Sequence, residues 1–262
     1  MNYQHILYQV TDGVASITLN SPDTLNALSE DLCAELNAAF DAGLTDKTVK
    51  IFVLKANGRI FSAGGNLQNF KDTLDAGKNF DGLLKSLGQL ALKLKQMPKL
   101  LITAVAGAAA GAGANLALAG DLVIAAENAK FLQSFTKIAA VPDGGGSYLL
   151  SRSIGFHKAM ELCLTARPLP AAEALELGVV YRVVPLEDLV TTADSLAREL
   201  ATGPLLAYQN LKQQMFAAYF ADYEQYLAEV EFTTMRQCME SADFAEGVDA
   251  FLSKRTPGYQ GN

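Results

Sequence analysis

The sequence predicts an α/β fold, because short apolar strand patterns alternate with amphipathic helix patterns over roughly the first 200 residues. Beyond that point only helical patterns follow, with interruptions at Gly203-Pro204 and Gly247. Half of the 262 residues are hydrophobic and 19% are charged, which is usual for a folded protein with one large core. We therefore expect a core over residues 1–200 and a helical region over residues 201–262 that packs on this core or on another subunit.

The individual elements follow from periodicity and from turn and cap residues. Apolar and polar residues alternate around Thr11-Asp12-Gly13, which predicts a β-hairpin from Ile6–Gln9 and Val14–Leu19. Ser29 has the position of a helix N-cap, since two acidic residues and then a helical apolar face follow it. Further strands are expected at residues 51–54, 100–105 and 122–126, and further helices at residues 80–97, which Pro98 ends, and 146–152.

Charge and patterning argue against several classes of protein. The net charge is −7 and the pI is about 4.9, so a nucleic-acid partner, which needs a basic surface, is not expected. The most apolar stretch, residues 100–126, is broken by glycines and Asp121, so we expect no membrane-spanning helix. The N-terminus has no pattern of a secretory leader, which favours a cytoplasmic protein.

Cysteine and histidine are too few for several kinds of site. Cys33, Cys163 and Cys238 form no C-x-x-C pair and lie in apolar helical patterns, so we expect buried free thiols. His5 and His157 are the only histidines. Neither a Ser-His-Asp or Cys-His nucleophile system nor a metal site is therefore expected.

A Gly/Ala-rich run at residues 104–121 leads from an expected strand into a helix pattern. Bare N–H groups where a helix begins, here around Ala112, stabilise negative charge on a ligand. The incomplete G-x-G at Gly111 and Gly113 argues against a dinucleotide site, because Leu116 stands where the third glycine is needed. Close packing of a helix explains the same run without any ligand.

A second loop and a carboxylate extend this pattern. The turn at residues 61–66, F-S-A-G-G-N, also follows an expected strand, so two loops are able to supply one N–H each to a single oxygen. Asp143 lies among glycines after the apolar segment 138–141, where burial raises the pKa of a carboxyl and suits it to proton transfer. Both segments are also common turn sequences, and turns of this kind occur in proteins without any catalytic function. Together they suggest enolate chemistry.

The chain resembles the crotonase superfamily, the enoyl-CoA hydratase/isomerase proteins, over essentially its whole length. The resemblance implies a spiral of β-β-α turns with C-terminal helices used for a homotrimer, which often stacks into a hexamer. It also implies that the backbone N–H groups of Gly65 and Ala112 hold the thioester oxygen of an acyl-CoA. The matching segments are L-N-S-P-D-T-L-N-A-L (19–28), F-S-A-G-G-N-L (61–67), residues 104–121, V-P-D-G-G-G (141–146) and F-L-S-K-R-T-P-G-Y-Q-G (251–261).

Differences from the hydratase pattern narrow the range of reactions that the resemblance implies. Hydratases of this superfamily carry two glutamates where this chain has Asn115 and Phe135, whereas Asp143 occupies the position of the single acid/base of isomerase branches. The pattern looks similar to that of ring 1,2-epoxyphenylacetyl-CoA isomerases and Δ3,Δ2-enoyl-CoA isomerases. Substrate or CoA contacts are implied at Ala63, Asn66, Asn115, Phe135 and Lys254.

The resemblance therefore implies an acyl-CoA isomerase of phenylacetate or fatty-acid breakdown that moves a double bond or rearranges a ring epoxide through a thioester enolate, with Asp143 as the acid/base. Coenzyme A enters as part of the substrate, and no separate cofactor or metal is implied. Two alternatives stay open. One is an enoyl-CoA hydratase that uses Asp143 alone, and the other is a non-catalytic member that binds acyl-CoA or RNA.

Overall fold

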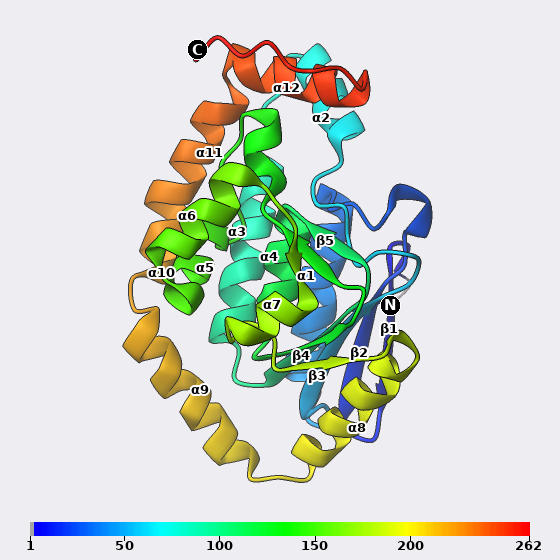
Figure 1. Ribbon diagram of the computed structural model, residues 1–262. Coiled ribbons are helices and arrows are strands. Elements are labelled where there is room, and N and C mark those ends of the chain that lie inside the picture. Colours follow the sequence, from blue (N-terminus) through cyan, green and yellow to red (C-terminus); the bar gives the residue numbers. More distant parts are fainter. Residues whose placement is uncertain (1–2) are drawn as a thin grey trace.

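A mixed sheet forms the centre of the molecule in the computed structural model, which describes residues 3–262 (Figure 1). Its strand order is β1-β2-β3-β4-β6-β9. The hairpin partners β1 and β2 are antiparallel, and the other neighbours are parallel. The strands are β1 (Ile6–Thr11), β2 (Val14–Leu19), β3 (Ile51–Ala56), β4 (Leu100–Val105), β6 (Leu122–Ala126) and β9 (Arg182–Val184).

Helices cover both faces of this sheet. The helices α1 (Glu30–Thr45) and α3 (Asp81–Gln96) pack together on one side, and α8 (Leu189–Ala201) packs on the other. Successive residues of β3 serve the two sides in turn, since Phe52 and Leu54 join the larger core and Ile51 and Val53 pack with α8. Burial on both faces explains why this strand reads as a continuous apolar run.

A smaller sheet, β5-β7-β8, lies beside the main one and was not predicted from the sequence. Its strands, β5 (Ala108–Ala110), β7 (Lys130–Leu132) and β8 (Leu169–Pro170), are too short to show a strand period. β5 leads directly into the helix α4 (Ala112–Leu118). The other helices of this part are α2 (Leu67–Asp75), α5 (Gly146–Ile154), α6 (Phe156–Thr165) and α7 (Ala171–Glu176), with 3-10 turns η1 (Pro22–Thr24), η2 (Ser134–Ile138) and η3 (Leu186–Asp188).

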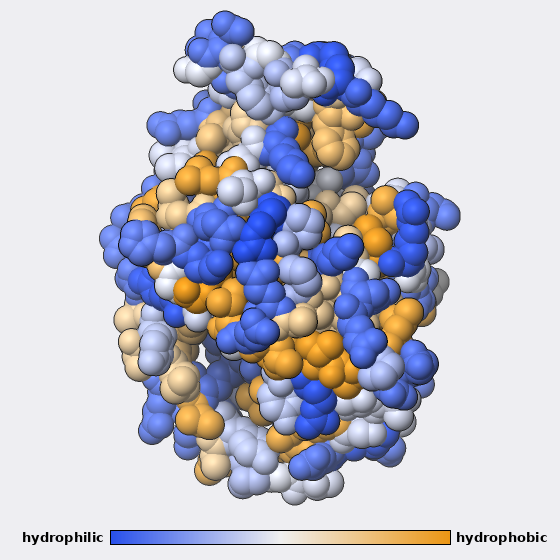
Figure 2. All heavy atoms as spheres, viewed as in Figure 1, coloured by the Kyte–Doolittle hydropathy of each residue, from blue (hydrophilic) through white to orange (hydrophobic). Residues whose placement is uncertain are grey.

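The chain after residue 204 is helical, as expected. It forms α9 (Leu205–Tyr219), α10 (Tyr223–Gln225), a π-helical turn η4 (Tyr226–Glu231), α11 (Phe232–Met239) and α12 (Ala242–Leu252). In Figure 1, α9 stands off from the sheet as an arm between α8 and α10, and Figure 2 shows a hollow beside this arm. The end of the chain returns, because α11 packs on α3 and α12 packs on α2.

The predicted features that depend on neighbouring residues, namely the hairpin turn and the helix cap, are confirmed. The hairpin turn has positive φ at Asp12 (52°) and Gly13 (79°), which suits a two-residue loop. The Ser29 side chain accepts a hydrogen bond from the Leu32 N–H at 3.2 Å and caps α1. All three cysteines are free thiols, but only Cys33 is fully buried, since α6 and α11 leave Cys163 and Cys238 partly exposed. Within residues 3–262, no helix is long and apolar enough to cross a bilayer.

Candidate active site

Backbone pairing holds the two predicted loops side by side. The Phe61 N–H donates to the Ala108 carbonyl, and the Ala110 N–H donates to the Ser62 carbonyl, each at 2.9 Å. A Cβ added at Gly64 would lie only 2.5 Å from the Ala110 carbonyl oxygen and 3.5 Å from the Ala112 nitrogen. Only glycine allows this approach, so the loops form one structural unit.

Each loop presents an N–H group at this junction. Ala112 is the first residue of α4, so its N–H has no acceptor within the helix. The backbone hydrogen bonds of the described residues give no acceptor to the Gly65 N–H either. The Phe70 ring packs where a Gly65 side chain would lie, 2.4 Å from a Cβ built there, and fixes this loop from the α2 side. Within residues 3–262 both N–H groups are therefore without a backbone acceptor, and their joint hold on one oxygen stays a prediction.

Asp143 is held next to α4 by buried amide groups. The Asn115 side-chain N–H donates to the Asp143 carbonyl at 2.7 Å, and the Gln133 side chain donates to the Asn115 carbonyl oxygen at 2.8 Å. Gly144 and Gly145 then take positive φ values of 60° and 80°, which lets α5 begin immediately. Asn115 thus links the helix that begins at Ala112 to the loop that carries Asp143.

The Asp143 carboxyl is buried without a counter-charge. Its side chain is 6% exposed, and its Oδ1 has no hydrogen-bond partner among the described residues. Burial raises the pKa of Asp143 to about 7. A carboxyl with this pKa exchanges protons readily at neutral pH, as the sequence analysis predicted.

Asp143 opens onto a cavity of about 380 Å³ between α3 and the segment α10–η4–α11. Gly88 of α3 contributes no side chain, and Leu84, Leu227, Phe232 and Met235 make much of the wall apolar. A volume of this size lies in the range of small-molecule sites. The cavity suits a ligand with an apolar part whose end lies beside the Asp143 carboxyl, which is able to carry a proton.

Glu231 is a second buried carboxyl in this cavity, and it was not predicted from the sequence. It is 5% exposed and accepts hydrogen bonds from the Gly145 N–H at 2.9 Å (Oε2) and 3.2 Å (Oε1). Burial, together with the charge of Asp143, raises the pKa of Glu231 to about 8. The only hint in the sequence is an acidic residue between Val230 and Phe232.

The remaining predicted contact residues do not line this cavity. Asn66 caps α2, since its side chain accepts from the Asn69 N–H at 3.1 Å, and the Ala63 N–H donates to the Leu25 carbonyl at 3.0 Å. Phe135 is buried in η2, with its ring beside Gly111. Lys254 is exposed after α12. Their contacts with a substrate stay predictions.

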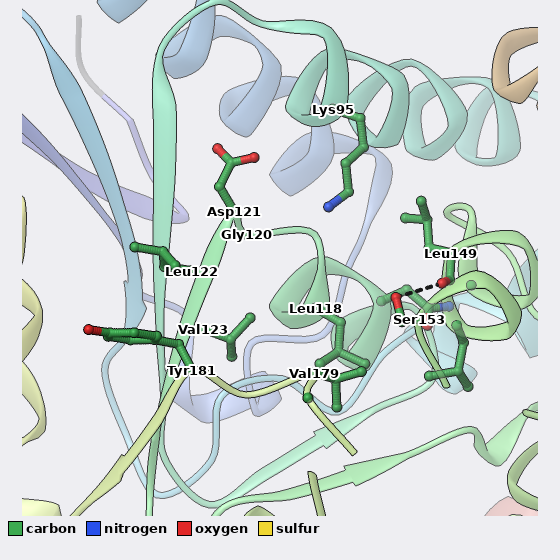
Figure 3. Close-up of a pocket in the computed structure, with 14 residues that line it drawn as sticks. Lys95, Leu118, Gly120, Asp121, Leu122, Val123, Leu149, Ser153, Val179 and Tyr181 are labelled. Carbon is green, nitrogen blue, oxygen red and sulfur yellow. Dashed lines mark hydrogen bonds between the residues drawn. The ribbon is translucent and has the colours of Figure 1, made fainter. Parts of the chain in front are cut away.

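A neighbouring cavity of about 320 Å³ lacks the elements of such a site. Figure 3 shows Lys95 and Asp121 at this cavity, which Asn115 also lines. The Asp121 carboxylate is already engaged by Lys212 and by the Leu101 N–H, both at 2.8 Å. Neither cavity is lined by Gly65 or Ala112. The cavity that Asp143 lines is the better candidate for proton transfer, because it holds a buried carboxyl with an oxygen that has no partner in the described part of the chain.

Comparisons with known proteins show the family of this chain. The chain matches the enoyl-CoA hydratase/isomerase family model over residues 9–262. It is 35% identical to the trans-2-decenoyl-[acyl-carrier-protein] isomerase of Streptococcus mutans over 263 residues, which cover 100% of both chains. It is 39% identical to the 1,2-epoxyphenylacetyl-CoA isomerase of Escherichia coli (strain K12) over 260 residues, or 98% of this chain and 99% of that one.

Solved structures also match along the whole chain. The crystal structure of an enoyl-CoA hydratase from Mycobacterium avium subsp. paratuberculosis K-10 has a TM-score of 0.89 and 33% identity, and the match covers 99% of this chain and 100% of that one. Proteins similar to this chain therefore carry both isomerase and hydratase names.

Proposed function

The chain belongs to the enoyl-CoA hydratase/isomerase family, and on this basis we propose that it is an isomerase that moves a double bond in an acyl-CoA thioester. The observation that carries the proposal is the Asp143 carboxyl, which is buried, has an oxygen without a partner and lines an apolar cavity. Asn115, at a position where hydratases of the family have a glutamate, is occupied in holding the Asp143 backbone. It cannot activate a water molecule as a carboxylate does.

The reaction follows from the placement of the backbone donors and the carboxyl. The N–H groups of Gly65 and Ala112 bind the thioester oxygen, and the Asp143 carboxylate takes a proton from a carbon made acidic by the thioester. The resulting enolate oxygen carries negative charge at the two donors, each of which is typically worth about 3 kcal/mol of barrier. Return of a proton at a different carbon completes the double-bond shift.

An assay with two substrates separates the proposed function from its main alternative. A 3-enoyl-CoA ester gains conjugated absorbance when it is isomerised, whereas crotonyl-CoA loses this absorbance when water adds. We expect the conjugated absorbance to increase with the 3-enoyl-CoA ester and to stay unchanged with crotonyl-CoA. Crotonyl-CoA hydration without isomerisation would favour the hydratase, and tight binding without turnover would favour a non-catalytic member. Because relatives act on acyl-carrier-protein and ring-epoxide substrates by name, both belong in the panel.

The pH dependence of kcat/KM is expected to report Asp143. The carboxylate is the active base, so kcat/KM should fall by about tenfold per pH unit below the Asp143 pKa of about 7. A carboxyl of ordinary pKa, about 3.9, would keep nearly full activity down to about pH 5. Initial rates from pH 5 to 8 provide the measurement, and a rate that is flat across this range would contradict the assignment.

Gly88→Phe is expected to shorten the acyl chain that the enzyme accepts. A Cβ at Gly88 meets nothing within 4 Å, so a large side chain fits the fold but fills the cavity. We expect kcat/KM to fall about tenfold or more for long 3-enoyl esters and little for short ones, as measured over a chain-length series. Gly88→Ala serves as the control, because it leaves most of the cavity volume free and raises the helix propensity of this position. Equal chain-length profiles in the two variants would place the acyl chain elsewhere.

We also propose that the protein assembles as a homotrimer, alone or stacked as a hexamer. Apolar side chains that are more than half exposed on α9, namely Leu206, Leu211, Met215 and Tyr219, support an interface between copies. Family membership supports the same assembly. The place of the reaction in phenylacetate or fatty-acid breakdown follows only from the family resemblance.

A further inference from the structure

Glu231 lies on the buried face of a helical segment that lines the cavity. It is the last residue of the π-helical turn η4 between α10 and α11. Such i→i+5 turns occur mostly as single insertions in helices, frequently at functional sites. Glu231 is buried and continues a face on which Tyr223, Leu227 and Met235 are also buried, whereas Glu229 and Val230 before it are exposed. A charged side chain therefore occupies a position on the inward face of this segment.

The hydrogen bond to the Gly145 N–H does not by itself account for a carboxyl at this position. A glutamine would accept the same bond without the cost of burying a charge. Among residues 3–262, no lysine or arginine pairs with Glu231 or with Asp143 to offset that cost. A buried, uncompensated pair of carboxyls is costly for the fold and is typical of sites that move protons.

Other titratable groups around the pair do not replace it. Lys85 and Glu224 also line the cavity, and both are exposed. Tyr223 and Tyr226 lie near Glu231, and burial raises the pKa of each phenol further above its ordinary value. Cys33 lies near Asp143, and burial raises the pKa of its thiol to about 12. At neutral pH only the two carboxyls are able to exchange protons within this part of the site.

We propose that Glu231 is a second proton carrier of this site, which delivers a proton to one carbon of the acyl chain after Asp143 has removed a proton from another. The proposal rests on the isomerase function proposed above. It differs from a mechanism in which Asp143 alone takes a proton and returns it. The assignment rests on two observations. Asp143 and Glu231 line the same cavity, and Glu231 accepts a hydrogen bond from the Gly145 N–H, two residues after Asp143.

The proposed transfers balance without any other reactant. The Asp143 carboxylate accepts the proton of a C–H bond, and the electron pair of that bond moves through the thioester to form the enolate. The double bond shifts as the far carbon accepts the proton of the neutral Glu231 carboxyl. Asp143 is then protonated and Glu231 is ionised. After product release Asp143 gives its proton to water and Glu231 takes one from water, so the starting state is restored and no proton is consumed.

Deuterium transfer tests the second carrier directly. A 3-enoyl-CoA ester is labelled with deuterium at the carbon that loses its hydrogen and is converted in ordinary water. With two carriers, we expect the wild type to place no label at the receiving carbon. In Glu231→Gln, Asp143 must do both transfers, so we expect kcat to fall about 100-fold and label to appear in the product. Label transfer by the wild type, or an unchanged rate and label in Glu231→Gln, would overturn the proposal.

The pH profile supplies an independent readout with a matched control. Glu231 must hold a proton to donate it, so kcat/KM of the wild type should decline above the Glu231 pKa of about 8. Glu231→Gln should lose this alkaline limb. Glu229→Gln removes an exposed carboxyl of the same turn that does not line the cavity, and it should leave rate, label and pH profile as in the wild type.

Titration without substrate separates this proposal from the proposed function. If the wild type converts no enoyl thioester, the isomerase function has failed. Infrared titration of the free protein then still tests the pair, because Asp143→Asn removes a charge that raises the pKa of the Glu231 carboxyl and should lower this pKa, whereas Glu229→Gln should not change it. A Glu231 titration that is identical in the wild type and Asp143→Asn would show that the two carboxyls do not act together.

Discussion

Replacement of Asp143 by Asn is expected to lower the turnover of 3-enoyl thioesters by about 10³-fold. The amide has the shape of the carboxyl but cannot accept a proton from carbon. Binding of the thioester should change little, since the expected grip on its oxygen comes from the backbone at Gly65 and Ala112. The loss should therefore appear in kcat and not in the affinity for an acyl-CoA.

Two measurements check this result. Conjugated absorbance gives kcat, and calorimetry with a saturated acyl-CoA gives the affinity. Asp31→Asn is the control, because Asp31 is an exposed carboxylate in the first turn of α1. Full activity in Asp143→Asn would remove Asp143 from the mechanism, and an equal loss in Asp31→Asn would point to a general effect on folding.

The same variant should be more stable than the wild type at alkaline pH. The folded-state pKa of Asp143, about 7, lies above its ordinary value of about 3.9, so the folded state binds the proton more tightly than the unfolded state. This contribution to stability is complete below pH 4 and is lost as pH rises through 7. Asparagine carries no charge to bury. Urea unfolding should therefore favour Asp143→Asn at pH 8, and the advantage should shrink toward pH 4.

Gly64→Ala is expected to lower kcat by about 100-fold through the geometry of the two backbone donors. The new Cβ would lie 2.5 Å from the Ala110 carbonyl oxygen, a backbone atom that has no other rotamer. The two loops must separate, and the N–H groups of Gly65 and Ala112 then no longer converge on one oxygen. The Asp143 carboxyl is untouched, so the acid limb of the pH profile should keep its position.

Gly77→Ala is a matched control for backbone strain. Gly64 and Gly77 both have positive φ, 87° and 62°, but a Cβ at Gly77 meets nothing within 4 Å. The left-handed conformation costs an alanine roughly 1–2 kcal/mol at either position. Steady-state kinetics and thermal unfolding of both variants isolate the effect of the contact. If the kcat of Gly64→Ala falls no further than that of Gly77→Ala, the loop contact does not set the donor geometry.

Much of the main sheet was predictable, because its signals are local. The hairpin around Asp12-Gly13, the cap at Ser29 and the strands that include residues 51–54, 100–105 and 122–126 appear as expected. The small sheet β5-β7-β8 was not predictable. Its three-residue strand of alanines at 108–110 is a strand only because the loop at 61–62 and β7 pair with it.

The candidate site was also predictable only in part. Asp143 stood out among glycines, and glycine-rich loops marked the positions of the backbone donors. The Asn115 amide looked like a substitute for a catalytic glutamate, but its side chain instead bonds the Asp143 carbonyl and Gln133. No short-range pattern indicates a partner 28 or 18 residues away in the chain.

The sequence by itself determined the α/β class, the two glycine-rich loops and the carboxyl of Asp143, since turn chemistry and periodicity depend on neighbours in the chain. Only the tertiary structure decided what surrounds that carboxyl. Glu231 reaches the Gly145 N–H across 86 residues because it lies on the buried face of its helical segment, next to the loop that carries Asp143. Burial, and with it the pKa of both carboxyls, is a property of packed surfaces and not of any short stretch of sequence.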